Sequence, residues 1–221
     1  MNDLEKAQSC IMQVVQQEPY LTGENVIVAV LDSGIDYFLP EFRDASGQTR
    51  ILAIWDQTQQ PDEAQGRMPP PGYREGILYT REMINEALAL GRENGQKLVP
   101  VFDISGHGTA VAGVAAGTGT GVAPGADLLI IKLGNPQADS FPRTTQLMRG
   151  INYAVNLGVE LGKPVVVNLS FGNTYGDHQG NSLLERFIDN ASEIGRSVIV
   201  VGSGNEGASG GHTAGIVQNT S

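Results

Sequence analysis

Short runs of aliphatic, mostly β-branched residues alternate with longer helical segments along this chain, and this alternation constrains its fold more than any other feature. The runs, bounded by Gly, Pro, Asp or Asn, are Val26–Leu31, Leu128–Lys132, Val165–Leu169 and Val198–Val201. Runs of this length and composition are typical of strands that are buried on both faces of a parallel sheet. The sequence therefore predicts a parallel sheet at the centre of the fold.

The segments between these runs have helical periodicity. The predicted helices are Thr109–Ala116, which is built from small residues, Thr145–Leu161 and Ser182–Ile194. Strand and helix in alternation imply right-handed crossovers with helices on both faces of the sheet. We therefore predict the α/β class, with a three-layer, doubly wound and mostly parallel sheet.

One stretch interrupts this rhythm. Asp56–Gly72 is polar and proline-rich, and its Pro69–Pro71 run excludes a helix or a central strand. Thr80–Gly91 behind it has helical periodicity. We expect residues 44–100 to form an insertion at the edge of the sheet, within a single domain that spans residues 1–221.

Composition narrows the classes of partner. The chain has 221 residues and a formal net charge of −10, and no basic cluster suggests nucleic acid or an anionic membrane surface as a partner. Its longest apolar run, Val26–Leu31, is far shorter than the roughly 20 residues of a membrane helix. The single cysteine, Cys10, excludes an intramolecular disulfide and a multi-thiolate metal site. Cys10 lies in an apolar helical pattern, so we expect it to be buried.

The first candidate for chemistry is Asp32, in the sequence VAVLDSGID. An apolar strand places this carboxylate at its carboxyl end, where sites form in open α/β sheets, and Gly34 permits the sharp turn that follows. The alternative is an aspartate that only hydrogen-bonds its own turn.

The second candidate is His107, in SGHGT at the start of a predicted helix. The positive end of the helix dipole favours the neutral imidazole that a general base requires. Glycines on both sides allow another backbone or a substrate to approach closely. An isolated histidine is more often structural, but the glycines and the possible partner Asp32 favour catalysis here.

The third candidate is the GSGNEG sequence of residues 202–207, which follows the Val198–Val201 run. It matches the glycine pattern of dinucleotide-binding loops, but neither an apolar helix nor a later carboxylate follows it. The alternative is that Asn205 presents its side-chain amide as a donor to a developing oxyanion.

These motifs, together with GVAPGA and NLSFG in the same order, resemble the subtilisin-like serine proteases. The resemblance runs from about Thr22 to Gly207 outside the insertion. The interval of 75 residues between Asp32 and His107, and the segments GDHQGNSLLER and NEGASGGH, further resemble the clostridial spore-germination branch of that family.

The resemblance implies roles for individual residues. Asp32 corresponds to the triad carboxylate, His107 to the general base and Asn205 to the side-chain oxyanion donor. Four residues correspond to the substrate-binding strand and the primary specificity pocket: Ser170, Phe171, Gly172 and Gly204. The implied partners are a protein or peptide substrate and a propeptide, and the implied location is secreted or spore-associated.

No cofactor is expected. Subtilases often have a calcium-binding loop after the catalytic histidine, but residues 115–121 here carry no carboxylate or amide side chain, so no metal site is expected. Asp177, His178 and His212 lie in glycine-rich loops, where we expect solvated side chains.

The nucleophile is the main departure from the family. The GTSxA motif that carries the serine does not occur, and Ser221 has neither a preceding glycine nor a following helix. We therefore expect a catalytic domain that is truncated before its serine, inactive as a fragment, and in need of the missing C-terminal part. The alternative is a pseudoprotease or regulatory binding module that lacks the nucleophile.

Overall fold

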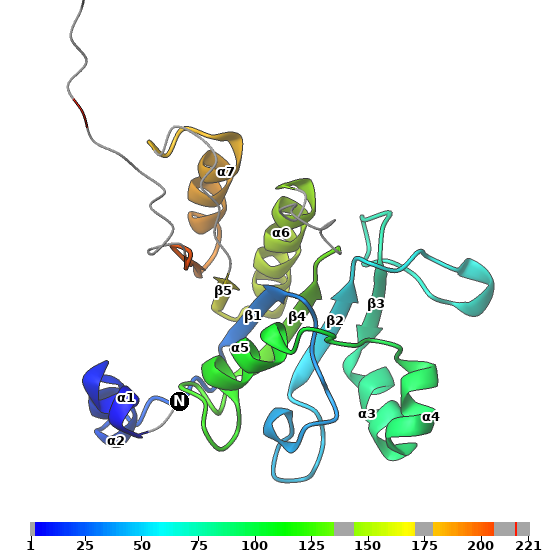
Figure 1. Ribbon diagram of the computed structural model, residues 1–221, viewed down its shortest axis with the longest axis horizontal. Coiled ribbons are helices and arrows are strands. Elements are labelled where there is room, and N and C mark those ends of the chain that lie inside the picture. The colour runs from blue at the N-terminus through cyan, green and yellow to red at the C-terminus, as the bar shows by residue number, and fades with distance from the viewer. Residues whose placement is uncertain (1–2, 135–143, 171–178, 206–214, 216–221) are drawn as a thin grey trace, which may run out of the picture.

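The computed structural model describes residues 3–134, 144–170, 179–205 and 215, and its centre is a six-stranded sheet (Figure 1). The strands are β1 (Ile27–Asp32), β2 (Ile51–Asp56), β3 (Ile77–Thr80), β4 (Asp127–Lys132), β5 (Val165–Leu169) and β6 (Ser197–Val201). Their order in the sheet is β3-β2-β4-β1-β5-β6. All neighbouring pairs are parallel except β2 with β3. This is the mostly parallel sheet that the sequence predicts.

Helices cover both faces of the sheet. The main ones are α3 (Arg81–Ala89), α4 (Gly91–Leu98), α5 (His107–Ala116), α6 (Thr144–Leu161) and α7 (Leu183–Ser192). Buried residues of α3 and α5 belong to one hydrophobic cluster, and those of α6 and α7 belong to another. The prediction of a three-layer, doubly wound α/β fold is therefore confirmed.

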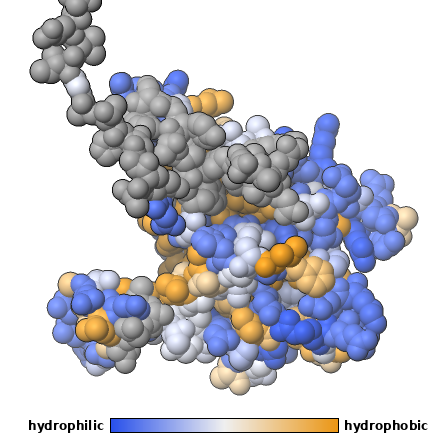
Figure 2. Space-filling view, in the orientation of Figure 1, coloured by the Kyte–Doolittle hydropathy of each residue, from blue (hydrophilic) through white to orange (hydrophobic). Residues whose placement is uncertain are grey.

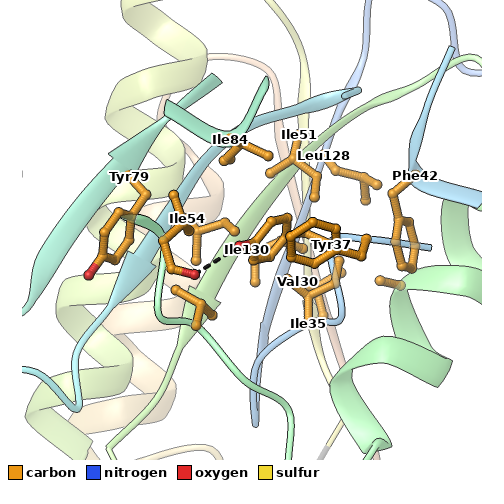
Figure 3. Packing of buried hydrophobic residues seen from close by; sticks show 14 of the residues in the cluster. Val30, Ile35, Tyr37, Phe42, Ile51, Ile54, Tyr79, Ile84, Leu128 and Ile130 are labelled. Atoms are coloured by element: carbon orange, nitrogen blue, oxygen red, sulfur yellow. Dashed lines mark hydrogen bonds between the residues drawn. The ribbon is translucent and has the colours of Figure 1, made fainter. Parts of the chain in front are cut away.

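The alternation of side chains along each strand separates these two clusters. In β1, Val28 and Val30 point to the α3 and α5 side, whereas Ile27, Ala29 and Leu31 point to the α6 and α7 side. Figure 3 shows Val30, Ile54 and Ile130 on the first side, packed with the ring of Tyr37. The buried Tyr37 hydroxyl donates to the carbonyl oxygen of Val99 at 2.9 Å.

Residues 44–100 contribute β2, β3, α3 and α4. The antiparallel strand β3 forms one edge of the sheet, and β2 lies inside it, between β3 and β4. A polar chain fixes the loop after β2, because the Tyr79 hydroxyl donates to Gln59 and Gln59 donates to the Asp56 carboxylate. The proline-rich segment thus connects two neighbouring strands of the sheet, β2 and β3.

The N-terminal helices α1 (Asp3–Gln8) and α2 (Ile11–Gln16) form a knob at one side of the molecule (Figure 2). No residue of α2 is buried, and Cys10 between the two helices is exposed. The expectation that Cys10 is buried is therefore wrong: Ile11 and Val15 of α2 are partly covered, but Cys10 itself is exposed. Among the described residues, no helix is long and apolar enough to cross a membrane.

Candidate active site

The sheet brings the predicted site segments to one edge. Asp32 is the last residue of β1, Ser170 directly follows β5, and Asn205 lies in the loop after β6. Since β1, β5 and β6 are parallel neighbours, their carboxyl ends lie at the same edge of the sheet. This edge is where binding and catalytic sites form in open α/β folds.

Asp32 and His107 are in direct contact. The imidazole Nδ1 of His107 lies 2.8 Å from Asp32 Oδ1 and 3.0 Å from Oδ2. The carboxylate side chain is only 5% exposed, whereas the imidazole is 54% exposed. The buried carboxylate therefore binds Nδ1, and the rest of the half-exposed imidazole ring is accessible to a substrate or another group.

The backbone around Asp32 fixes this geometry. Ser33 N donates to Asp32 Oδ1 at 2.7 Å, so the carboxylate has a second donor besides the imidazole. Gly34 has φ of +129°, and a Cβ there would lie 2.7 Å from the carbonyl oxygen of Phe102. Only glycine fits this turn, because any side chain would force apart the loop after β1 and the loop that leads into α5.

Helix α5 presents His107 as its first residue. The residue before it, Gly106, has φ of +73° and provides no side-chain cap. Ala112 and Ala116 of α5 are fully buried against the sheet. These small residues let the helix lie close to β1, so that its first turn reaches the end of that strand.

Asp103 is a further residue of this site, and the sequence interpretation missed it. Its Oδ1 accepts hydrogen bonds from Ser33 Oγ at 2.7 Å and from Gly106 N at 3.0 Å, and its Oδ2 accepts from Thr109 Oγ1 at 2.6 Å. Burial raises the pKa of Asp103, but the hydrogen bonds from Thr109, Ser33 and Ser105 outweigh it and hold that pKa below its ordinary value. The sequence signal for this role is the position of Asp103, an aspartate that lies four residues before His107, the first residue of a helix.

The proposed substrate-binding and oxyanion residues are described only in part. Ser170 Oγ accepts a 2.6 Å hydrogen bond from Asn168 Nδ2. Gly204 has φ of +91°, and the next residue, Asn205, is exposed. Phe171 and Gly172 lie outside the described residues, as do Asp177, His178, His212 and Ser221. The structure therefore brings Asp32 and His107 together and places Ser170 and Asn205 at the same sheet edge.

Within the described ranges, no group of three or more His, Cys, Asp or Glu side chains is arranged to hold a metal ion. The chemistry that this part of the chain supports directly is proton transfer at His107. A carboxylate bound to Nδ1 fixes the imidazole tautomer and leaves Nε2 as the basic nitrogen.

Comparison with known proteins agrees with the motifs. The sequence pattern of the subtilase family matches residues 23–220. Subtilisin E of Bacillus subtilis (strain 168) is 27% identical over 194 residues, covering 86% of this chain and 36% of that protein. A PII-type proteinase of Lacticaseibacillus paracasei is 27% identical over 220 residues, covering 93% of this chain and 10% of that protein.

A solved structure supports the same assignment. The CspB protease of Clostridium perfringens is 37% identical with a TM-score of 0.76, and the match covers 89% of this chain and 39% of that one. The present chain thus spans less than half of each of these relatives. The resemblance that the motifs indicated is confirmed, and the chain belongs to the subtilase family.

Proposed function

We propose that this chain carries the Asp–His part of a serine endopeptidase site. The contact between His107 Nδ1 and the buried Asp32 carboxylate is the observation that carries the proposal. In this reading, Asp32 orients the imidazole and stabilises the imidazolium that forms during acyl transfer. His107 Nε2 accepts the proton of the attacking serine and later donates it to the leaving amine.

The proposal assigns the serine to sequence outside these 221 residues. It is supported by the extent of the comparisons, because the chain corresponds to 36% of subtilisin E and 39% of the CspB protease. Asn205 would donate its side-chain amide to the oxyanion of the tetrahedral intermediate. A donor of this kind contributes about 10²–10³ in turnover, a magnitude measured in subtilisin itself.

The substrate in this proposal is a peptide or protein. Residues 170–172 would pair with its backbone and Gly204 would form the floor of the primary pocket, as the motifs of the family imply. A propeptide is a further expected partner. Relatives such as the minor extracellular protease Vpr of Bacillus subtilis favour a site of action outside the cytoplasm.

The test uses the longer protein that includes the downstream serine. Asp32→Asn keeps the shape of the side chain but favours the wrong imidazole tautomer, so peptide cleavage should fall by about 10⁴-fold, and His107→Ala should lose at least as much. Asp36→Asn is the matched control, because Asp36 binds Arg92 at the surface. Its turnover should be unchanged.

Two results would overturn the proposal. Cleavage retained in His107→Ala would show that this histidine is not the base. A longer protein that neither cleaves peptides nor forms an acyl-enzyme would instead support a binding module that keeps the fold of a protease.

A further inference from the structure

Both carboxylate oxygens of Asp103 accept hydrogen bonds from backbone amides at the start of α5. Oδ1 accepts from Gly106 N at 3.0 Å, and Oδ2 accepts from Thr109 N at 2.8 Å and from Thr109 Oγ1 at 2.6 Å. The residue at the helix start, Gly106, has no side chain for this purpose. Asp103 therefore does for α5 what an N-capping side chain does for an ordinary helix.

Two serines extend the reach of the same carboxylate. Ser33 Oγ donates to Asp103 Oδ1 at 2.7 Å and accepts from Gly108 N at 3.0 Å. Ser105 Oγ lies 3.1 Å from Asp103 Oδ1 and accepts from His107 N at 3.1 Å. Together with its direct bonds, Asp103 thus accounts for the four consecutive amides at the start of the helix that carries the imidazole.

The same network is anchored in the loop after β1. Ser33 directly follows Asp32, and its hydroxyl is the group bound to Asp103. On the other side, Thr109 Oγ1 accepts from Asp36 N at 2.9 Å. One carboxylate therefore joins the segment that carries Asp32 to the segment that carries His107, although Ser33 and Asp103 are 70 residues apart in sequence.

We propose that Asp103 is a positioning residue, which holds α5 and the loop after β1 in the register that places His107 Nδ1 against the Asp32 carboxylate. Asp103 makes no hydrogen bond to the side chain of Asp32 or of His107; it acts through Ser33, Ser105 and the helix amides. Its importance for turnover rests on the proposed function, whereas its effect on the pair can be measured without any activity.

The direct test observes the Nδ1 proton of His107 by NMR in the 221-residue chain. In the unaltered protein, this proton is held between imidazole and carboxylate, so it should exchange slowly and resonate far downfield. Asp103→Asn keeps the size of the side chain but puts an NH₂ group where an acceptor oxygen was. Exchange of the Nδ1 proton should then become about 10-fold to 100-fold faster, as expected for loss of a hydrogen bond to a charged group.

A second variant guards against simple misfolding. Ser33→Ala keeps the bonds from Gly106 and Thr109 to Asp103 but removes the hydrogen bond that links Asp103 to the loop after β1. The exchange rate of the Nδ1 proton should therefore rise less than in Asp103→Asn. Two controls separate positioning from charge and from stability. Asp36→Asn removes a neighbouring carboxylate charge but keeps the backbone N–H that donates to Thr109 Oγ1. Ile84→Val weakens the buried packing of α3 away from the network. Both should leave the Nδ1 signal unchanged.

The kinetic test uses the longer protein. Asp103→Asn should lower kcat by about 10-fold to 100-fold and leave KM within about twofold, because substrate contacts are intact while the base is misplaced. An unchanged Nδ1 signal in folded Asp103→Asn would overturn the positioning role, whatever the activity of the protein. A signal that changes as expected, combined with full cleavage by His107→Ala, would keep the positioning role and reject the proposed function instead.

Discussion

Gly108 lies directly against the backbone of Gly34. A Cβ at Gly108 would be 2.4 Å from the carbonyl oxygen of Gly34 and 3.1 Å from Cβ of Asp32. The second residue of α5 thus touches the turn that follows the buried carboxylate, and the absence of a side chain there sets how closely helix and strand approach.

The first prediction follows from this contact. Gly108→Ala should destabilise the protein by about 1–3 kcal/mol, because backbone must shift to admit the methyl group. It should also separate His107 from Asp32. Denaturant unfolding measures the first effect, and the downfield Nδ1 proton signal of His107 measures the second.

Gly113 in the same helix provides the matched control, since a Cβ there meets nothing within 4 Å. Gly113→Ala should be neutral or stabilise by up to about 1 kcal/mol through its helix propensity. Equal stabilities for the two variants would contradict the steric argument.

The second prediction concerns Arg50, whose guanidinium binds three separate segments. Nη1 donates to the carbonyl oxygen of Ala126 at 2.6 Å, and Nη2 donates to the carbonyl oxygens of Glu41 and Ala116. Arg50→Met removes the guanidinium donor from the carbonyl oxygens of Ala126 and Ala116, whereas that of Glu41 still accepts from Thr118. The substitution should cost about 2–4 kcal/mol in the free energy of unfolding.

Arg92 is a suitable comparison, because its ion pair with Asp36 lies at the surface, with side chains that are 52% and 34% exposed. Arg92→Met should change stability by about 1 kcal/mol or less. Urea unfolding measures the stability of both variants. If Arg92→Met lost as much free energy of unfolding as Arg50→Met, the carbonyl contacts of Arg50 would not explain its contribution to stability.

The sequence predicted those parts of the fold that depend on local apolar pattern. The runs that became β1, β4 and β5 are continuous, β-branched and largely buried. The expectation that Val198–Val201 is buried on both faces is wrong, because β6 lies at the edge of the sheet and Val198, Val200 and Val201 are about half exposed. The helices between these strands have regular apolar spacing. The meeting of Asp32 and His107 was also predictable, because one residue ends a strand and the other begins a helix. Both positions lead to the carboxyl edge of a parallel sheet.

The missed features depend on tertiary context. Ile51–Asp56 forms β2 and has the same apolar character as the predicted strands. The polar, proline-rich segment that directly follows it is typical of an insertion, so the sequence pattern did not predict a strand there. The position of Asp103 four residues before His107 is a local signal for binding the first turn of α5, but its link to Ser33, 70 residues away, depends on the fold and cannot be predicted from a local pattern. Periodicity identified the apolar side of the segment around Cys10, but it could not show that the rest of the fold covers this side only in part and leaves Cys10 exposed.

The third prediction uses the lowered pKa of Asp103. A carboxyl group whose pKa is lower in the folded state stabilises the fold above its unfolded pKa, near 4, and this contribution is lost as pH falls through the folded pKa. Asp103→Asn should therefore be less stable than the unaltered protein at neutral pH, and the difference should shrink as the pH falls below about 4. Urea unfolding at a series of pH values measures this difference, and a gap that stays constant into acid would argue against an ionised Asp103 in the folded protein.

The last prediction concerns covalent labelling. A fluorophosphonate reacts with a serine whose hydroxyl lies within hydrogen-bond reach of a basic imidazole nitrogen. The proposed function places that serine outside the 221 residues, so this chain should not be labelled, as intact-protein mass spectrometry would show. The longer protein should take up one label, and His107→Ala should abolish it, because the serine then has no base. Labelling of the 221-residue chain at Ser221 would show that the chain contains its own nucleophile, and the assignment of the serine to downstream sequence would fall.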